Sequence, residues 1–285
     1  MIKISVVILT YNSASYIKPC LNSLYMQSYQ DFEVIVVDNG SKDETMSLVK
    51  EIYPQAILIE NKDNLGASKG RNQGIEAARG EWIVTLDCDI ILENNFLSQV
   101  VGSIKHASKT PGMIQPKIMN AGKNTIFSAG IYVSFLRRFY DLGRNEIDSA
   151  KFNKQKDIFG VCSAAAVYNR NMLEAVRGKD GYFDERFFFL FEDVDLSWRA
   201  QKKGIKALFC PDAVCYHNGN SSQTSKRIRQ YLCLRNRYFT LLKNDFPLRI
   251  ILAFIFYDLP RLLYILITNP YALKAVNDVL YFKHS

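Results

Sequence analysis

Two clusters of carboxylates, about a hundred residues apart, are the part of this sequence best suited to chemistry. The first is Asp87-Cys88-Asp89, which directly follows the apolar run Trp82–Leu86. The second is Glu192-Asp193-Val194-Asp195, which follows the aromatic run Phe187–Phe191. Carboxylates beside apolar strands lose hydration and need compensation. A divalent cation bound to a diphosphate would balance the negative charge of the first cluster. Transfer of a proton during catalysis would explain the second cluster.

The spacing of the first cluster suits a cation. Where the chain turns at the end of a strand, one or both carboxylates of an Asp-x-Asp pair can face an ion, and Mg²⁺ or Mn²⁺ takes few protein carboxylates and leaves sites for phosphate oxygens. His217 follows the expected strand Ala213–Tyr216 and can supply a third ligand. Asp is also common in turns that bind nothing, and a lone loop histidine is usually structural, so both interpretations stay open.

The second cluster suits acid–base chemistry. The bulky aromatic residues before it would partly desolvate its carboxylates, and desolvation raises a carboxylate pKa and makes the group a better base. Acidic residues at a helix start are also favourable without any function, because they interact with the helix dipole. The purely structural interpretation of Glu192 and Asp193 therefore stays open as well.

Two further polar groups are candidates for ligand binding. Asp38 stands at the tip of an expected strand, where it can accept a hydrogen bond from a nucleobase, although an Asx turn that caps the next helix is an alternative for Asp38–Ser41. The basic residues Lys62, Lys69 and Arg71 lie around the start of a glycine-rich helix and can face phosphates, since helix N-termini favour anions. A solvated helix face explains the same charges.

The elements that must position these residues alternate between strand and helix in the first half of the chain. Apolar, β-branched runs predict strands over Lys3–Thr10, Glu33–Val37, Ala56–Glu60 and Glu81–Leu86. Caps and periodicity predict helices from Ser13 or Ser15 to about Gln27, over Asp43–Ile52 and over Gly66–Ala78. This order predicts βαβ units and a parallel sheet, whose ligands bind beyond the carboxyl ends of the strands. Three polar groups fall at such ends: Thr10 to Asn12, Asp38-Asn39, and Asp87 to Asp89.

The second half of the chain is less regular. The pattern predicts a helix over Asn94–His106, strands with turns within Gly112–Val133, and a strand of small residues over Ile158–Asn169. The polar residues 137–157 read as a mobile loop, and the second carboxylate cluster opens a helix that reaches about Lys203.

The positive charge of the chain is concentrated at its C-terminal end. The net charge of +8 divides into +7 over residues 226–285 and +1 over residues 1–225. Residues 226–244 suit a basic, aromatic helix, and residues 246–268 are strongly apolar but include Asp258, Pro260 and Arg261. A spanning helix needs about 20 apolar residues. We expect instead in-plane amphipathic or re-entrant helices that are broken at Pro260 and that lie on an anionic membrane surface.

Composition sets outer limits on the class of protein. The length of 285 residues and the hydrophobic fraction of 48% fit one large domain, or one domain with an appendage. The six cysteines are not spaced like the ligands of a metal site. We therefore expect them to be reduced thiols in the cytosol. The N-terminal residues do not resemble a signal peptide. The basic tail admits a nucleic acid as partner as well as a membrane.

Five motifs occur in the order found in family 2 glycosyltransferases, and they resemble most closely the rhamnosyltransferase-like branch. The resemblance covers about residues 3–240. It implies an α/β GT-A (Rossmann-like) fold with a mostly parallel sheet flanked by helices, a nucleotide-diphosphate sugar as donor, a divalent cation and inversion at the anomeric carbon. The motifs are Val6–Asn12, Val37–Ser41, Gly66–Asn72, Asp87–Asp89 and Phe191–Arg199.

The resemblance also implies roles for individual residues. Asp193 matches the catalytic base, Glu192 matches its neighbour on the acceptor side, and Trp198 and Arg199 line the same helix as acceptor-binding candidates. Asp89 matches the metal-binding aspartate, and His217 is a weaker metal-ligand match. Residues that match donor-binding positions are Thr10, Asn12, Asp38, Arg71 and Asp87.

Departures from family patterns narrow the expected activity. The Q-x-x-R-W signature of processive synthases is absent. The mostly apolar segment Ile90–Glu93 follows the Asp-x-Asp motif, where polyprenyl-phosphate mannose synthases have polar residues. A hydroxyl acceptor is therefore favoured over a lipid phosphate, and a polyprenyl-phosphate glycosyltransferase is the alternative. A nucleotidyltransferase or a dehydrogenase would need a glycine-rich loop after the first strand. A non-catalytic sugar- or nucleic-acid-binding module would not explain acidic clusters at strand ends.

We therefore expect a catalytic domain over residues 1–225, with a donor-binding half over 1–110 and an acceptor-binding half over 111–225, and a basic amphipathic segment over 226–285. The expected reaction moves one sugar from a nucleotide-sugar to a hydroxyl of a lipid-linked glycan, with Mg²⁺ or Mn²⁺. We expect the protein to work at the cytoplasmic face of the cell membrane, where it binds anionic lipid as a peripheral or monotopic protein. We expect no nucleic acid as partner.

Overall fold

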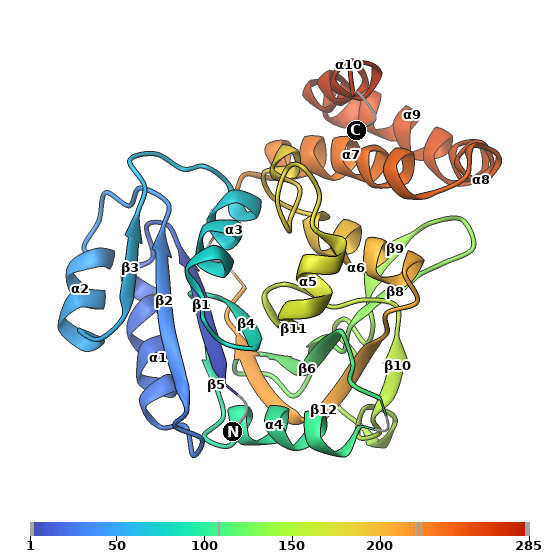
Figure 1. Ribbon diagram of the computed structural model, residues 1–285. Helices are drawn as coiled ribbons and strands as arrows, with labels where there is room; N and C mark the ends of the chain where they lie inside the picture. Colours follow the sequence, from blue (N-terminus) through green and yellow to red (C-terminus); the bar gives the residue numbers. More distant parts are fainter. Residues whose placement is uncertain (1–2, 108, 220–221, 223, 283–285) are drawn as a thin grey trace.

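The computed structural model describes residues 3–107, 109–219, 222 and 224–282 (Figure 1). The strands are β1 (Ile4–Thr10), β2 (Phe32–Asp38), β3 (Ile57–Glu60), β4 (Trp82–Asp87), β5 (Ile90–Leu92), β6 (Met113–Asn120), β7 (Ile126–Ser128), β8 (Ile131–Val133), β9 (Phe139–Asp141), β10 (Lys156–Ile158), β11 (Ala165–Asn169) and β12 (Ala207–His217). The α-helices are α1 (Ala14–Tyr25), α2 (Thr45–Ile52), α3 (Ala67–Ala77), α4 (Phe96–His106), α5 (Arg170–Val176), α6 (Glu192–Lys202), α7 (Lys226–Asn244), α8 (Pro247–Ala253), α9 (Leu259–Thr268) and α10 (Lys274–Leu280).

The main sheet runs in the order β10-β12-β6-β11-β4-β1-β2-β3, with β5 paired to β12 and β7 to β6. The pairs β4–β1, β1–β2 and β2–β3 are parallel, as the alternating pattern predicts. The expectation of a mostly parallel sheet fails in the second half, because β11 is antiparallel to both of its neighbours, β4 and β6. A parallel neighbour needs a long crossover, usually a helix. Residues 121–164, between β6 and β11, form short strands, turns and one 3₁₀ helix and no α-helix, so the sheet is mixed.

Helices cover both faces of the sheet and bury its alternating side chains. Apolar residues of α1, α2 and α4 pack with Val6 and Ile8 on one face. Residues of α3, α5 and α6 pack with Val7 on the other face. Because successive side chains of a strand point to opposite faces, both sides of β1 are buried. The result is a three-layer arrangement that holds the carboxyl ends of β1, β2 and β4 at one edge.

Two segments of the second half differ from the prediction. Residues 137–157, expected to be a mobile loop, contain β9, a short 3₁₀ helix (Ala150–Phe152) and the first residues of β10. Within 158–169, only Ile158 and Ala165–Asn169 belong to strands. The intervening residues pass close to α6, since Val161 N donates a hydrogen bond to Ser197 Oγ at 3.3 Å. These pairings join segments far apart in sequence, which local propensity does not reveal.

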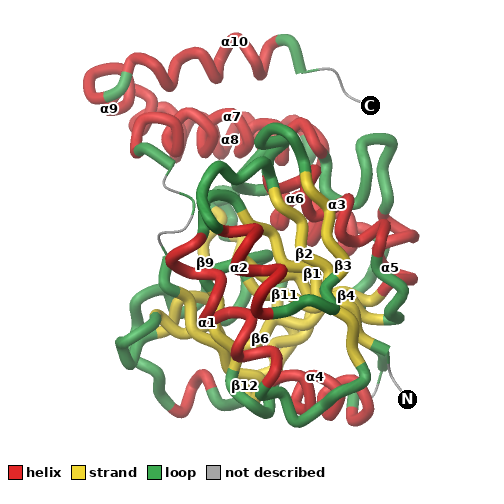
Figure 2. Tube along the Cα trace, turned by 90° about the vertical axis from the view of Figure 1, so that its left-hand side faces the viewer, coloured by secondary structure: helices red, strands yellow, loops and turns green. Residues whose placement is uncertain are grey.

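The helices α7 to α10 form a separate layer, drawn in orange and red at the top of Figure 1. In Figure 2, α7 and α8 lie below α10, and α7 is in contact with both. The expected break at Pro260 is wrong. A π-helical turn over Phe254–Asp258 joins α8 to α9 without a gap, and Pro260 sits in the first turn of α9, where its missing N–H is tolerated. Among the described residues, no helix is long and apolar enough to cross a membrane.

Candidate active site

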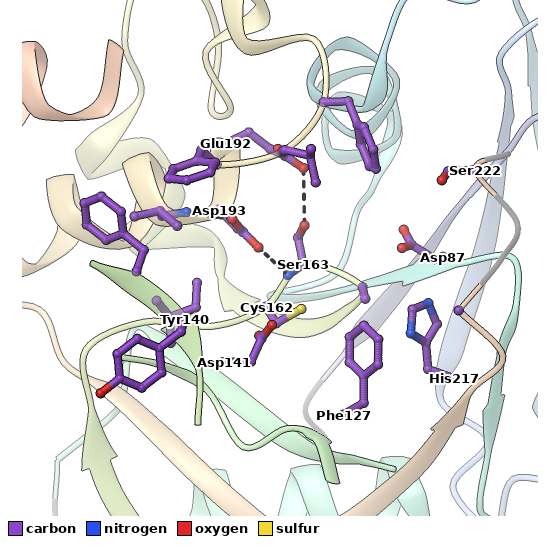
Figure 3. A pocket seen from close by; sticks show the side chains of 18 of the residues that line it. Asp87, Phe127, Tyr140, Asp141, Cys162, Ser163, Glu192, Asp193, His217 and Ser222 are labelled. Atoms are coloured by element: carbon purple, nitrogen blue, oxygen red, sulfur yellow. Dashed lines mark hydrogen bonds between the residues drawn. The ribbon is translucent and has the colours of Figure 1, made fainter. Parts of the chain in front are cut away.

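Both carboxylate clusters open into one cavity of about 290 Å³. The end of β4 brings Asp87, the turn after it brings Asp89, and the first turn of α6 brings Glu192 and Asp193. Figure 3 shows Asp87 and His217 on one side of Ser163 and Asp193 on the other. The mixed sheet makes this possible, because the residues just before β11 pass directly beside the end of β4.

Asp87, Asp89 and His217 form a group that fits a metal ion. Their ligand atoms all lie within 4.8 Å of one another. The register of β12 on β5 pairs His217 with Ile90, so that the imidazole Nε2 lies 3.2 Å from Asp89 Oδ1. Asp89 is 1% exposed, and the buried His217 Nδ1 has no hydrogen-bond partner among the described residues. Two carboxylates and an imidazole are a suitable donor set for a divalent cation such as Mn²⁺.

Arg71 connects the two carboxylate clusters. Its guanidinium donates to Asp87 Oδ1 at 2.8 Å and to Glu192 Oε1 at 2.6 Å, and the side chain is 3% exposed. Both carboxylates keep Arg71 protonated, and its pKa lies above the usual range despite burial. A buried charge needs such paired, hydrogen-bonded partners. Arg71 therefore fixes the distance between the metal group and the start of α6.

Asp193 has the properties of a general base. Its Oδ2 accepts a hydrogen bond from Ser163 N at 3.1 Å, and its Oδ1 accepts one from Val194 N at 2.8 Å. Burial, followed by the charges of Glu192 and Asp141, raises the pKa of Asp193 to about 7. A base whose pKa lies near neutral pH combines a useful ionised fraction with good proton affinity.

An unusual loop places the start of α6. Phe188, Leu190 and Phe191 have φ angles of 64°, 70° and 71°, a left-handed conformation that costs non-glycine residues of order 1–3 kcal/mol each. Asn236 on α7 compensates, since its buried amide donates to the carbonyls of Phe187, Phe189 and Leu190 at 2.7 to 3.0 Å. The strained loop is thus held by a helix that the sequence assigns to the C-terminal segment.

The same loop occupies the N-terminus of α3. The first two N–H groups of that helix, from Ala67 and Ser68, both donate to the carbonyl of Phe188. A Cβ at Gly66 would stand 2.6 Å from that carbonyl oxygen. Lys69 pairs with Glu185 at 3.2 Å. The Phe188 carbonyl and Glu185 therefore already use several donors at this helix start, and its contact with phosphates stays a prediction.

The predicted donor-binding residues separate into two groups. Thr10, Arg71 and Asp87 line a second cavity of about 390 Å³ beside the first, between β1 and the start of α3. Asp38 and Asn12 belong to a turn network instead. Asp38 accepts hydrogen bonds from the backbone N and the hydroxyl of Ser41, and Asn12 Oδ1 accepts one from Lys42 N at 2.8 Å. The Asx-turn interpretation of Asp38 is confirmed, and the structure leaves its contact with a nucleobase a prediction.

Trp198 and Arg199 lie beneath the cavity and not among its lining residues. Trp198 packs edge-on against Phe139 and Phe159. The guanidinium of Arg199 binds Asp195 at 2.9 Å and donates to the carbonyls of Val176 and Tyr182. We do not retain either residue as an acceptor contact, because Trp198 packs in an aromatic cluster and the guanidinium of Arg199 is already bound by three protein groups.

Sequence reasoning missed several residues of the site. Asp141 and Arg144 reach the cavity from the segment expected to be a mobile loop, and Ser163 comes from the turn before β11. Burial raises the pKa of Asp141. The signal that could have identified this segment is its aromatic alternation, Phe139-Tyr140-Asp141, which is typical of a strand.

Comparison with known proteins identifies the family. A family model described as glycosyl transferase family 2 matches residues 5–177, more than half of the chain. The chain belongs to glycosyltransferase family 2. The matched segment includes β1 to β11, with Asp87, Asp89 and Arg71, and it ends before Asp193.

Family 2 relatives are distant in sequence and longer than this chain. The glycosyltransferase GlyA of Streptococcus pneumoniae serotype 4 is 24% identical over 201 residues, which are 67% of this chain and 29% of the relative. The poly-beta-1,6-N-acetyl-D-glucosamine synthase of Staphylococcus aureus strain COL is 23% identical over 253 residues, which are 85% of this chain and 58% of the relative. The chain thus spans between about a third and three-fifths of these relatives.

Solved structures of other proteins share the fold. S. aureus TarS 1-349 superimposes with a TM-score of 0.62 at 20% identity, over 97% of this chain and 80% of that one. GalNAc-T7 with UDP, GalNAc and Mn²⁺ gives a TM-score of 0.61 at 17% identity, over 76% of this chain and 43% of that one. At such identities the likeness shows a GT-A-like glycosyltransferase fold.

Proposed function

We propose that this family 2 protein is an inverting glycosyltransferase that moves a single sugar from a nucleotide-diphosphate sugar to a hydroxyl group of a lipid-linked glycan. The observation that carries the proposal is the geometry of one cavity. A group that could hold a metal ion, Asp87, Asp89 and His217, stands on one side, and a carboxylate with a pKa of about 7 stands on the other.

In the proposed reaction, Asp193 accepts the proton of the acceptor hydroxyl as its oxygen attacks the anomeric carbon. The bond between that carbon and the donor diphosphate breaks on the opposite face, which inverts the configuration. A divalent cation held by Asp87, Asp89 and His217 would supply electrostatic stabilisation of the leaving diphosphate. Arg71 holds Glu192, the neighbour of the base, in register with the metal group.

The properties of Asp193 favour a hydroxyl acceptor over a lipid phosphate. A hydroxyl must lose its proton as it attacks, and a positioned base contributes about 10²–10⁴-fold to such a step. A phosphate acceptor is already ionised at neutral pH and gains little from a base. A polyprenyl-phosphate glycosyltransferase is therefore the second candidate for the activity. The rhamnosyltransferase-like branch, on which the identity of the sugar depends, remains part of the proposal.

A panel of nucleoside diphosphates tests the donor. The TarS structures include complexes with UDP and UDP-GlcNAc, so UDP is the first nucleotide to try. Ligands that bind the native state raise its melting temperature by mass action. We expect one nucleotide to raise the melting temperature more with Mn²⁺ than with EDTA, and the matching nucleotide-sugar to be hydrolysed slowly without an acceptor. The absence of both effects for every common nucleotide would contradict the proposal.

We further propose that the protein works at the cytoplasmic face of the membrane, held there by α8, α9 and the π-helical turn between them. Several large apolar side chains of these helices are exposed: Leu248, Ile251, Ile255, Phe256, Leu263 and Ile267. Burial of apolar surface yields roughly 25 cal/mol per Å². The net charge of +7 on residues 226–285 would add attraction to anionic lipid.

Sedimentation with anionic vesicles tests this localisation. We expect the full chain to sediment with phosphatidylglycerol vesicles, and high salt to weaken binding without abolishing it, since salt screens only the electrostatic part. The double substitution Phe256→Ser and Ile267→Ser should release the protein. Met26→Ser, which removes a 62% exposed side chain at the end of α1, is the control. Equal binding of all three proteins would contradict the proposal.

A further inference from the structure

A basic cavity adjoins the active site. It has a volume of about 680 Å³ and lies between the β8–β9 hairpin, α7 and the start of α9. Five cationic side chains line it, and the carboxylate among the lining residues is that of Asp258. The five cations are Arg138, Lys226, Arg229, Arg237 and Arg261. A cavity of this size is large enough for a small organic ligand.

Only one of these cations is neutralised by the lining carboxylate. Arg237 binds Asp258 through two hydrogen bonds of 2.8 and 3.0 Å, and both side chains are buried. Arg261 donates to the hydroxyl of Tyr257 at 2.7 Å, and Arg138 lies over the ring of Tyr140. Among the described residues, no carboxylate forms an ion pair with Arg138, Lys226, Arg229 or Arg261. The cavity therefore carries an excess of positive charge that an anionic ligand would balance.

The basic cavity adjoins the acidic one. Phe139, Tyr140, Phe191 and Arg229 line both. The three aromatic residues form a partition between the cavities, and the rings of Phe139 and Phe191 pack edge to face with their centroids 5.6 Å apart. A ligand that lies across this aromatic partition would reach Asp193 at one end and the cations at the other.

The far end of the basic cavity meets the exposed apolar helices. Leu262, Tyr264 and Ile265 on α9 line the cavity. Leu263 and Tyr264 are 57% and 63% exposed, so an apolar surface continues outward from the cations. The order along the molecule is thus acidic cavity, aromatic partition, basic cavity and apolar surface. An amphiphile with a sugar, a phosphate group and a hydrocarbon chain has the same order of chemistry.

We infer that the basic cavity binds the phosphate or diphosphate group that joins the acceptor sugar to its lipid, with Arg138 and Arg261 as principal contacts. This inference rests on the proposed function, since it assigns the acceptor side of the same reaction. Guanidinium groups suit phosphate because their planar donors bind its oxygens in pairs. The sugar would then lie against the aromatic partition with its hydroxyl at Asp193, and the first part of the lipid would lie on α9.

Calorimetric titration with inorganic pyrophosphate in EDTA tests the site. Without a cation, the carboxylates of the acidic cavity repel pyrophosphate, so that binding reports the basic cavity. We expect the wild-type protein to bind pyrophosphate and the double variant Arg138→Gln/Arg261→Gln to bind it about tenfold more weakly or worse. The matched control is Arg249→Gln/Lys274→Gln, which removes the same charge from exposed positions outside the cavity. Equal weakening by both pairs, or no binding by the wild type, would overturn the inference.

Farnesyl diphosphate distinguishes the source of the phosphate. If the group belongs to a lipid, farnesyl diphosphate should bind the wild type at least about tenfold more tightly than pyrophosphate does. Equal affinities would support a phosphate site in the basic cavity but would contradict a lipid as the source of the phosphate. Hydrolysis of the nucleotide-sugar without acceptor should be the same in the wild type and in Arg249→Gln/Lys274→Gln, whose substitutions lie outside both cavities. If no protein hydrolyses any donor, the proposed function fails while pyrophosphate binding still decides the basic cavity.

Discussion

The acidic and basic cavities share a wall, but their charges are arranged in opposite ways. In the acidic cavity, Arg71 binds Asp87 and Glu192. The pKa of Asp193 is raised there because the side chain is buried and lies near other carboxylates. In the basic cavity, one arginine is paired with a buried carboxylate and four cations are not. The first arrangement prepares groups for a cation and for proton transfer, and the second prepares a surface for an anion. The comparison assigns chemistry to one cavity and acceptor binding to the other.

The largest expected effect comes from the base. Asp193→Asn keeps the size of the side chain but removes its ability to take a proton, so sugar transfer should fall by about 10²–10⁴-fold. Binding of the donor nucleotide should be unchanged. Single-turnover transfer and nucleotide titration measure the two quantities. Asp212→Asn, an exposed position on β12, is the control. A fall of less than about tenfold, with chemistry rate-limiting, would assign the base to another residue.

The next effect concerns the metal group. Asp89→Asn replaces an anionic ligand by a neutral one, and we expect nucleotide affinity in Mn²⁺ to fall by about tenfold or more. Affinity measured in EDTA should not change, and neither should the circular dichroism spectrum. Asp63→Asn, on an exposed loop, controls for the loss of one negative charge. If the variant still binds nucleotide more tightly with Mn²⁺ than without it, the cation is held elsewhere.

A smaller effect concerns the support of the acidic cavity by α7. Asn236→Asp would face three carbonyl oxygens with an acceptor in place of a donor, and leaving such buried groups unsatisfied costs about 1–3 kcal/mol. We expect the midpoint of urea unfolding and the rate of transfer to fall together. Asn22→Asp on the exposed face of α1 should leave both unchanged. A stability loss with normal transfer would show that the active site does not depend on the support of the loop by Asn236.

The smallest effect is a shift in pH dependence. Asp193 must be ionised to accept a proton, so kcat/KM should rise with pH through about 7. Asp141 raises the pKa of Asp193 by like-charge repulsion. Asp141→Asn should therefore lower that pKa and move the rising limb to lower pH, by less than about one unit. A shift to higher pH would mean that Asp141 does not act on the base by its charge.

Local patterns predicted the first half of the fold well. Apolar runs that end in polar turns located β1, β2 and β4, and with them Asp87 and Asp89, because parallel strands bury both faces and their ends are marked in sequence. The proximity of the two carboxylate clusters was implied by the family resemblance alone. Arg71, which the resemblance assigns to donor binding, also links the two clusters, and no local pattern predicted that link.

The second half depends on contacts that no local pattern reveals. The antiparallel insertion of β11 between β4 and β6 brings Ser163 to the base, and it results from pairing across some 80 residues of chain. The support of Phe187–Leu190 by Asn236 joins two segments that the sequence assigns to different domains. In the sequence, Asp258 interrupts an apolar run as an exposed charge would. In the structure it is 2% exposed and paired with Arg237. Each case depends on a distant partner, which composition and periodicity do not identify.

The division between the two cavities is tested most directly by steady-state transfer with a short lipid-linked acceptor, compared between Asp193→Asn and Arg138→Gln/Arg261→Gln. The account predicts that Asp193→Asn lowers kcat and leaves the KM of the acceptor nearly unchanged. It predicts that the arginine pair raises the KM of the acceptor and leaves kcat nearly unchanged. A loss of kcat with normal KM in both variants would contradict the account, because the basic cavity would then serve the chemical step and not the binding of the acceptor.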